Sequence, residues 1–213
     1  MDSEELLYRK LGEQIGKHIS KVVSMEVVMD IETISAPQED IDHFLELFPS
    51  KKKKMASPGL HPCTSRILVI GFKPVGKDPV IYIGDERQVL LDAKTFLENS
   101  NPTRIITFNG VGFDIPMIRW RAAKNGIPGF GNLLPSSRSP RNYDIYQKIR
   151  WEMPMSLGEA SMLITDNIKK TVGSAVEEMY SAGRIDDILE YNKRDLEITE
   201  ILYVNRKDLL GLD

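Results

Sequence analysis

Residues Val27–Thr33, VVMDIET, place two carboxylates at the end of an apolar run that is rich in β-branched side chains. Such a run predicts a buried β-strand. Side chains alternate between the two faces of a strand, so Val28, Asp30 and Glu32 share one face. Two acids held side by side in a partly dry setting repel one another unless a proton or a cation neutralises them. The stretch therefore marks either a solvated strand end or a metal site.

Two further segments carry acids in ordered contexts. Residues 105–114, IITFNGVGFD, repeat the arrangement of apolar strand, glycine-containing turn and acid, and a helical pattern begins at Asp114. Residues 188–202 predict a helix, on which Tyr191 and Asp195 lie four positions apart and so share a face. A fold that brings these segments to the acid pair of the first strand would gather oxygen ligands, which hard divalent cations such as Mg²⁺ prefer.

The three segments together resemble the DEDD superfamily of 3′-to-5′ exonucleases. The motifs that carry the resemblance are D-x-E at Asp30 and Glu32, N-x-x-x-F-D at Asn109, Phe113 and Asp114, and Y-x-x-x-D at Tyr191 and Asp195. The tyrosine of the third motif indicates the DEDDy branch. The phrases DIET, FNGVGFD and YNKRDLEIT are most similar to stand-alone relatives of the proofreading exonuclease domain of family B DNA polymerases.

The resemblance implies an α/β fold with a ribonuclease H-like mixed β-sheet flanked by α-helices. We expect residues 25–213 to form this exonuclease domain and residues 1–24 to form an N-terminal helical extension. Hydrophobic patterns and turn residues predict the following elements: a hairpin of strands 67–72 and 79–84, a helix at 85–99, a strand at 104–108 parallel to the first, a helix at 115–125, an irregular stretch at 129–143, and helices within 156–207. The connection 34–64 is expected to be a loop with a short helix around 41–48.

The resemblance also implies a function. Two divalent metal ions, Mg²⁺ or Mn²⁺, would be held by Asp30, Glu32, Asp114 and Asp195, and Tyr191 would orient the attacking water and help to deprotonate it. The expected substrate is the 3′ end of single-stranded nucleic acid, with DNA favoured, and the products are nucleoside 5′-monophosphates. The alternatives are an exoribonuclease that trims RNA 3′ ends and a non-catalytic binding or docking subunit of the same fold. The presence of all four acids and the tyrosine argues against the last.

Candidates for substrate contact are less sharply defined. Thr33 directly follows the first motif, Asn109 either stabilises its turn or contacts substrate, and Phe113 either stacks on a terminal base or packs in the core. The basic run Lys51, Lys52, Lys53 and Lys54 lies in the connection that leaves the first strand. This run is either a solvated loop tip or a basic segment that binds the nucleic acid.

Four charged residues lie in or after the helix that follows the second motif, and we expect mainly structural roles for them. Arg119, Arg121 and Lys124 are expected on a solvated helix face, with Arg119 near enough in sequence to be considered for a phosphate. Asp144 resembles an extra acid found near this position in relatives. We expect it to be a hydrogen-bonding or capping residue rather than a metal ligand.

Composition limits the class of protein. The chain has 213 residues, 41% of them hydrophobic, and a net charge of −3, which argues against a protein that coats nucleic acid through bulk positive charge. Its single cysteine, Cys63, excludes an intramolecular disulfide framework and suits a reducing cytoplasm. We expect no signal peptide, and no apolar run approaches the ~20 residues that cross a bilayer. These patterns do not define an oligomeric state.

Overall fold

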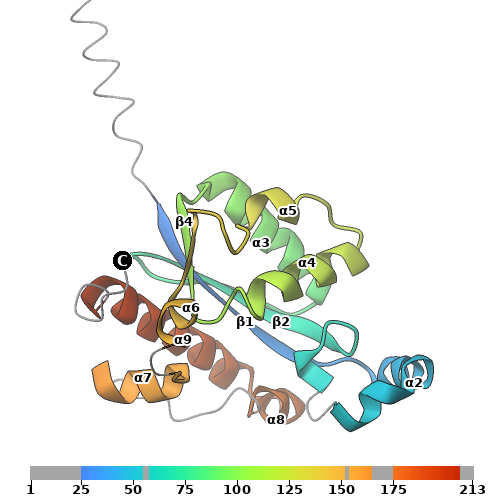
Figure 1. The fold of residues 1–213 in the computed structure, drawn as a ribbon. Coiled ribbons are helices and arrows are strands. Elements are labelled where there is room, and N and C mark those ends of the chain that lie inside the picture. Colours follow the sequence, from blue (N-terminus) through green and yellow to red (C-terminus); the bar gives the residue numbers. More distant parts are fainter. Residues whose placement is uncertain (1–24, 55–57, 152–153, 165–174, 207–213) are drawn as a thin grey trace, which may run out of the picture.

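A computed structural model describes residues 25–54, 58–151, 154–164 and 175–206. Within these residues, a five-stranded mixed sheet with the order β3-β2-β1-β4-β5 forms the centre of the fold (Figure 1). The strands are β1 (Glu26–Ser35), β2 (Ser65–Pro74), β3 (Val80–Ile83), β4 (Arg104–Thr107) and β5 (Asn142–Asp144). Strands β1, β2 and β3 are antiparallel, whereas β1, β4 and β5 are parallel. The expected helical extension, residues 1–24, lies outside the described residues.

Helices cover both faces of the sheet (Figure 1). One face packs against α3 (Glu86–Ser100), α4 (Asp114–Lys124) and α5 (Phe130–Leu133). The other packs against α6 (Ile145–Ile149), α7 (Leu157–Ile164), α8 (Ala175–Ser181) and α9 (Ile185–Arg206). The connection from β1 to β2 contains α2 (Gln38–Leu47) and the 3₁₀ helices η1 (Pro49–Lys54) and η2 (Pro58–Leu60). No helix among the described residues combines the length and the apolar character needed to cross a membrane.

Strand β1 divides its side chains between the two layers, as its alternating pattern predicts. The odd-numbered residues Val27, Met29 and Ile31 pack into the core beneath α3 and α4. Val28 packs instead with Leu196 of α9, so Asp30 and Glu32 share the face that α9 covers. The register with β2 shifts between Glu32 and Thr33, where β2 contains the additional residue Leu68.

The predicted ribonuclease H-like α/β fold is confirmed, and so are the hairpin, the parallel strand and the helices around it. The prediction that the stretch 129–143 is wholly irregular is wrong, because it contains α5 and most of β5. Strand β5 has only three residues and is defined by pairing with β4, for example Ile106 with Tyr143. A strand this short shows too little alternation to be found from sequence.

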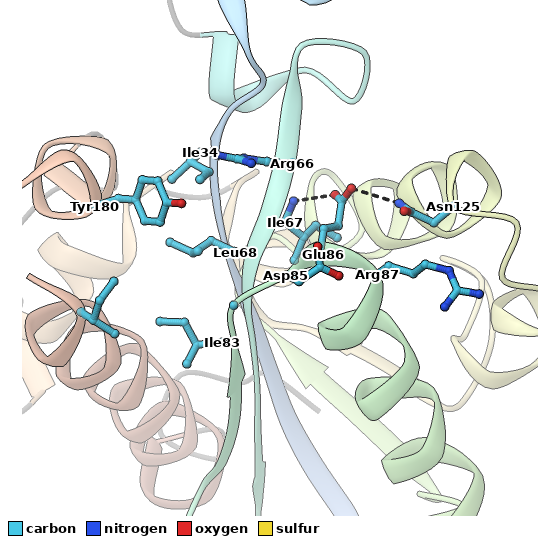
Figure 2. A pocket seen from close by; sticks show the side chains of 12 residues that line it. Ile34, Arg66, Ile67, Leu68, Ile83, Asp85, Glu86, Arg87, Asn125 and Tyr180 are labelled. Carbon is cyan, nitrogen blue, oxygen red and sulfur yellow. Dashed lines mark hydrogen bonds between the residues drawn. The ribbon is translucent and has the colours of Figure 1, made fainter. Parts of the chain in front are cut away.

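Arg121 does not lie on a solvated helix face, contrary to the sequence prediction. Its guanidinium is buried and forms two hydrogen bonds with Glu86, from Nε to Oε1 (2.7 Å) and from Nη2 to Oε2 (2.6 Å). Its Nη1 donates to the carbonyl of Pro62. Glu86 also accepts from the backbone N–H of Ile67 and from Asn125 (Figure 2). This network joins the first turn of α3 to α4 and β2, so the helix packs through a charged pair.

Arg119 and Lys124, the other two basic residues that were expected on a solvated face of α4, have different surroundings. Arg119 Nη2 donates to the carbonyls of Leu134 and Pro135, which directs it to the backbone rather than to a phosphate. Lys124 is exposed and lies 3.8 Å from Asp40, so it does occupy the solvated face that was predicted.

Candidate active site

Three of the predicted acids meet where β1 faces α9. One carboxylate oxygen from each of Asp30, Glu32 and Asp195 lies within 4.8 Å of the other two. Glu32 is 7% exposed and Asp195 is 4% exposed, whereas Asp30 is half-buried. Negative charges this close together and this poorly solvated raise the free energy of the site, and a cation lowers it. The all-oxygen donor set fits a hard divalent cation.

The fourth acid, Asp114, lies beside this cluster. It is the first residue of α4, is buried, and its Oδ1 accepts a hydrogen bond from the backbone N–H of Ile31 at 3.1 Å. Burial raises the pKa of Asp114 to about 7, and the charges of Asp144 and Asp195 act in the same direction against the backbone hydrogen bonds. The structure therefore brings all four acids of the predicted set to one region, with Asp114 attached to the backbone of β1.

Tyr191 lies one helical turn before Asp195 on α9 and is 5% exposed. Burial raises the pKa of Tyr191 well above its ordinary value, and the charges of Asp195, Glu32 and Asp30 raise it further. Its hydroxyl also shares a hydrogen bond with Asp195, which favours the protonated phenol. At neutral pH the phenol is thus a hydrogen-bond donor, and without a cation it is a poor base.

The turn between β4 and α4 is held by Asp144. Asp144 Oδ1 accepts from the backbone N–H of Asn109, and Oδ2 accepts from that of Val111, both at 2.9 Å. Asn109 has a left-handed backbone (φ 68°), which asparagine tolerates better than most residues. Asp144 also caps α6 through the N–H of Gln147. Asp144 is a hydrogen-bonding and capping residue, as predicted, and it supports the turn that leads to Asp114.

The other substrate-contact candidates have different surroundings. Thr33 Oγ1 donates to the carbonyl of Gly59 at 2.6 Å, so it attaches η2 to β1 next to Glu32. Phe113 is partly buried against the core beneath α3 and α4. The lysine run lies on η1, where Lys51 and Lys52 are exposed.

Asn192 is a neighbour of the cluster that the sequence reasoning missed. Its Nδ2 donates to Asp30 Oδ2 at 2.8 Å, and the side chain is fully buried. A sequence signal was available, because Asn192 directly follows Tyr191 and lies three residues before Asp195, which places it on an adjoining part of the same helix face.

A pocket of ≈ 550 Å³ opens elsewhere, where β3 ends at the edge of the sheet (Figure 2). Arg66, Leu68 and Ile83 line it from the strands, and Tyr180 lines it from α8. None of the four predicted acids borders this pocket. The chemistry of the cluster therefore belongs to the sheet face under α9 rather than to this cavity.

Comparisons with known proteins agree with this geometry. Residues 61–150 match the model of the family described as DNA polymerase family B, exonuclease domain. That match contains the second motif, and the first and third motifs flank it. The chain thus contains a domain that resembles the proofreading exonuclease of family B DNA polymerases, which confirms the resemblance inferred from the motifs.

Two archaeal polymerases illustrate the likeness. A DNA polymerase of Archaeoglobus fulgidus is 25% identical over an alignment of 166 residues, and the alignment covers 68% of this chain and 20% of the polymerase. The structure of the family B DNA polymerase of Pyrobaculum calidifontis matches 87% of this chain and 24% of its own, with a TM-score of 0.64 and 19% identity. The chain spans about a fifth of the curated relative and about a quarter of the solved structure.

Proposed function

We propose that the chain is a metal-dependent 3′-to-5′ exonuclease that hydrolyses single-stranded nucleic acid to nucleoside 5′-monophosphates. The observation that carries the proposal is the approach of Asp30, Glu32 and Asp195 within 4.8 Å, with Asp114 beside them. DNA is the favoured substrate because the matching family and both relatives are DNA polymerases. The catalytic unit would comprise residues 25–213, and residues 1–24 would be a helical extension.

The four acids would hold two divalent cations, Mg²⁺ or Mn²⁺. When bound, such a pair supplies a hydroxide-like nucleophile at neutral pH and stabilises the charge that develops on the leaving 3′-oxygen. Asp114, whose pKa is about 7 in the metal-free protein, must be ionised to take part. Glu32 on β1 and Asp195 on α9 are buried where the strand and the helix meet, which limits the access of bulk water to these two carboxylates.

Tyr191 would act as a hydrogen-bond donor at this site. Its raised pKa keeps the proton on the phenol, so the residue can orient the attacking water or a phosphate oxygen. Removal of the proton from the water must then depend mainly on the bound cations. This is a narrower role than the shared deprotonation expected from the family resemblance.

Timed digestion of matched DNA and RNA oligonucleotides tests the proposed function. Each substrate carries a 5′ label, and reactions contain Mg²⁺, Mn²⁺ or a chelator. The proposal requires a ladder of products shortened from the 3′ end, release of 5′-monophosphates, and no reaction with the chelator. Faster digestion of RNA would favour the 3′-end trimming exoribonuclease. Binding without cleavage under all metal conditions would favour the non-catalytic subunit.

Replacing Tyr191 with Phe should lower kcat about 10²-fold, because a positioned proton-transfer or hydrogen-bonding group contributes at least about this much. The ring and its packing remain, so the affinity for Mn²⁺ should change little. Single-turnover digestion at several pH values measures the effect. Wild-type rates for the Phe variant across that range would remove the hydroxyl from the mechanism.

Replacing Lys51–Lys54 with Ala should weaken the binding of long oligonucleotides and make it less dependent on salt. For each phosphate of a single strand that the variant no longer neutralises, the slope of log affinity against log salt becomes shallower by about 0.7. The measurement uses Asp114→Asn protein, so that the substrate is not consumed. Dinucleotides, which we expect to be too short to reach η1, provide the internal control. Equal salt slopes for the long oligonucleotide, with and without the four lysines, would show that the lysines do not contribute to binding.

A further inference from the structure

We infer that Asn192 is a positioning residue that fixes the Asp30 carboxylate for the bound cation, and that Gly71 exists at its position to make room for it. The inference rests on the proposed function, because it assigns a role in holding the metal. Its basis is a contact between α9 and β1 in which Asn192, a residue outside the four acids and the tyrosine, donates to one of those acids. Nothing in the motif pattern requires either residue.

The contact has a defined chemical orientation. Asn192 Nδ2 lies 2.8 Å from Asp30 Oδ2, and only the amino side of the amide can face a carboxylate, because the carbonyl side would repel it. Since Asn192 is fully buried, its side chain is held by packing and directs this one donor to Asp30. The hydrogen bond fixes the plane of a carboxylate that is itself only half-buried.

The choice of a neutral donor matters for the cation. A lysine or arginine at this position would also bind Asp30, but its charge would cancel the negative potential that attracts a metal ion. The amide orients the carboxylate and leaves its charge intact. Hydrogen-bonding partners behind metal ligands act in this way, and their loss commonly weakens metal binding about 10- to 100-fold.

Gly71 provides the space in which this amide sits. It pairs with Asp30 across β1 and β2, and a Cβ atom built there would lie 2.1 Å from Asn192 Oδ1. The same Cβ would lie 2.7 Å from Leu196 Cδ1. Any larger residue must displace the amide or the helix that carries it. The buried Oδ1 has no hydrogen-bond partner within the described part of the chain, so packing against the glycine holds that end of the amide.

The test is Mn²⁺ affinity, measured by calorimetry or by the paramagnetic resonance signal of free Mn²⁺, with no substrate present. Asn192→Leu keeps the size of the side chain and removes the donor, and it should raise the Kd for Mn²⁺ about 10-fold or more. The melting temperature in chelator reports whether the variant is folded. Asn99→Leu, at an exposed position on α3, is the matched control and should bind Mn²⁺ like the wild type.

A double-mutant cycle tests the part played by Gly71 and remains informative if the leucine variant does not fold. Gly71→Ala alone should weaken Mn²⁺ binding, because its methyl group pushes the amide from Asp30. Combined with Asn192→Ala, which vacates that space, it should add little further loss. Independent, additive losses would overturn the role of Gly71. Wild-type Kd values in folded Asn192 variants would overturn the inference, whereas a wild-type protein that neither binds Mn²⁺ nor cuts nucleic acid would overturn the proposed function itself.

Discussion

Asp114→Asn should reduce exonuclease activity by at least about 10³-fold and leave the metal-free protein as stable as the wild type, or more stable, at neutral pH. The activity falls because a ligand to the catalytic cations contributes several kcal/mol, and each 1.36 kcal/mol corresponds to a tenfold change in rate. The fold tolerates the change because the asparagine oxygen can still accept from the N–H of Ile31. The same variant removes a buried charge from the neighbourhood of Asp195.

The effect on stability depends on pH in a direction that the raised pKa defines. In the unfolded chain the pKa of Asp114 is 3.8, whereas in the metal-free fold burial raises this pKa to about 7. Between these values the native state holds the proton and the unfolded state does not. The free energy of unfolding therefore falls as pH rises through this window, by up to about 1.4 kcal/mol per pH unit, and the contribution levels off above it.

Chemical denaturation in chelator between pH 4 and pH 8 measures this dependence. Asp114→Asn should flatten the fall, and Mn²⁺ should raise the stability of the wild type near neutral pH, because a ligand that binds only the native state stabilises it. Asp78→Asn, at an exposed position, provides the control and should retain both activity and pH dependence. A large loss of metal-free stability in the Asp114 variant would make Asp114 a structural residue.

Arg121→Met should lower the free energy of unfolding by about 3–5 kcal/mol. The change leaves the Glu86 carboxylate, whose side chain is 11% exposed, without the cation that binds both of its oxygens. The variant also lacks the hydrogen bond from Arg121 to the carbonyl of Pro62. The methionine fills much of the volume, so the effect reports chiefly on charge rather than on a cavity.

Urea denaturation of the wild type and three variants separates this effect from a general effect of replacing arginine. Arg184 forms an exposed pair with Asp187, so Arg184→Met should change stability by no more than about 1 kcal/mol. Replacing both Arg121 and Glu86 with apolar residues should recover part of the stability, although Ile67 N–H then lacks its acceptor. A destabilisation by Arg121→Met as small as that by Arg184→Met would mean that water reaches the Glu86 carboxylate.

Features that depend on a local pattern could be predicted from the sequence alone. Alternation along β1 placed Asp30 and Glu32 on one face, and a four-residue spacing placed Tyr191 with Asp195. The burial of Arg121 was not predictable in this way, because a charged residue on a helix is normally solvated and its partner lies 35 residues away. Helical spacing places Asn192 near Asp195, but its packing against Gly71 of β2 joins segments far apart in the chain and is not visible in the local sequence.

The separation between Asp30 and Asn192, 162 residues along the chain, has a consequence for biosynthesis. Strand β1 is synthesised before the other four strands of the sheet, and α9, which completes the cluster, follows all of them. Contacts between such distant segments form late and slowly in folding, because long loops must close first. A nascent chain therefore lacks the assembled site until α9 has emerged. The proposed exonuclease can therefore degrade nucleic acid only after the whole span from β1 to α9 has been made.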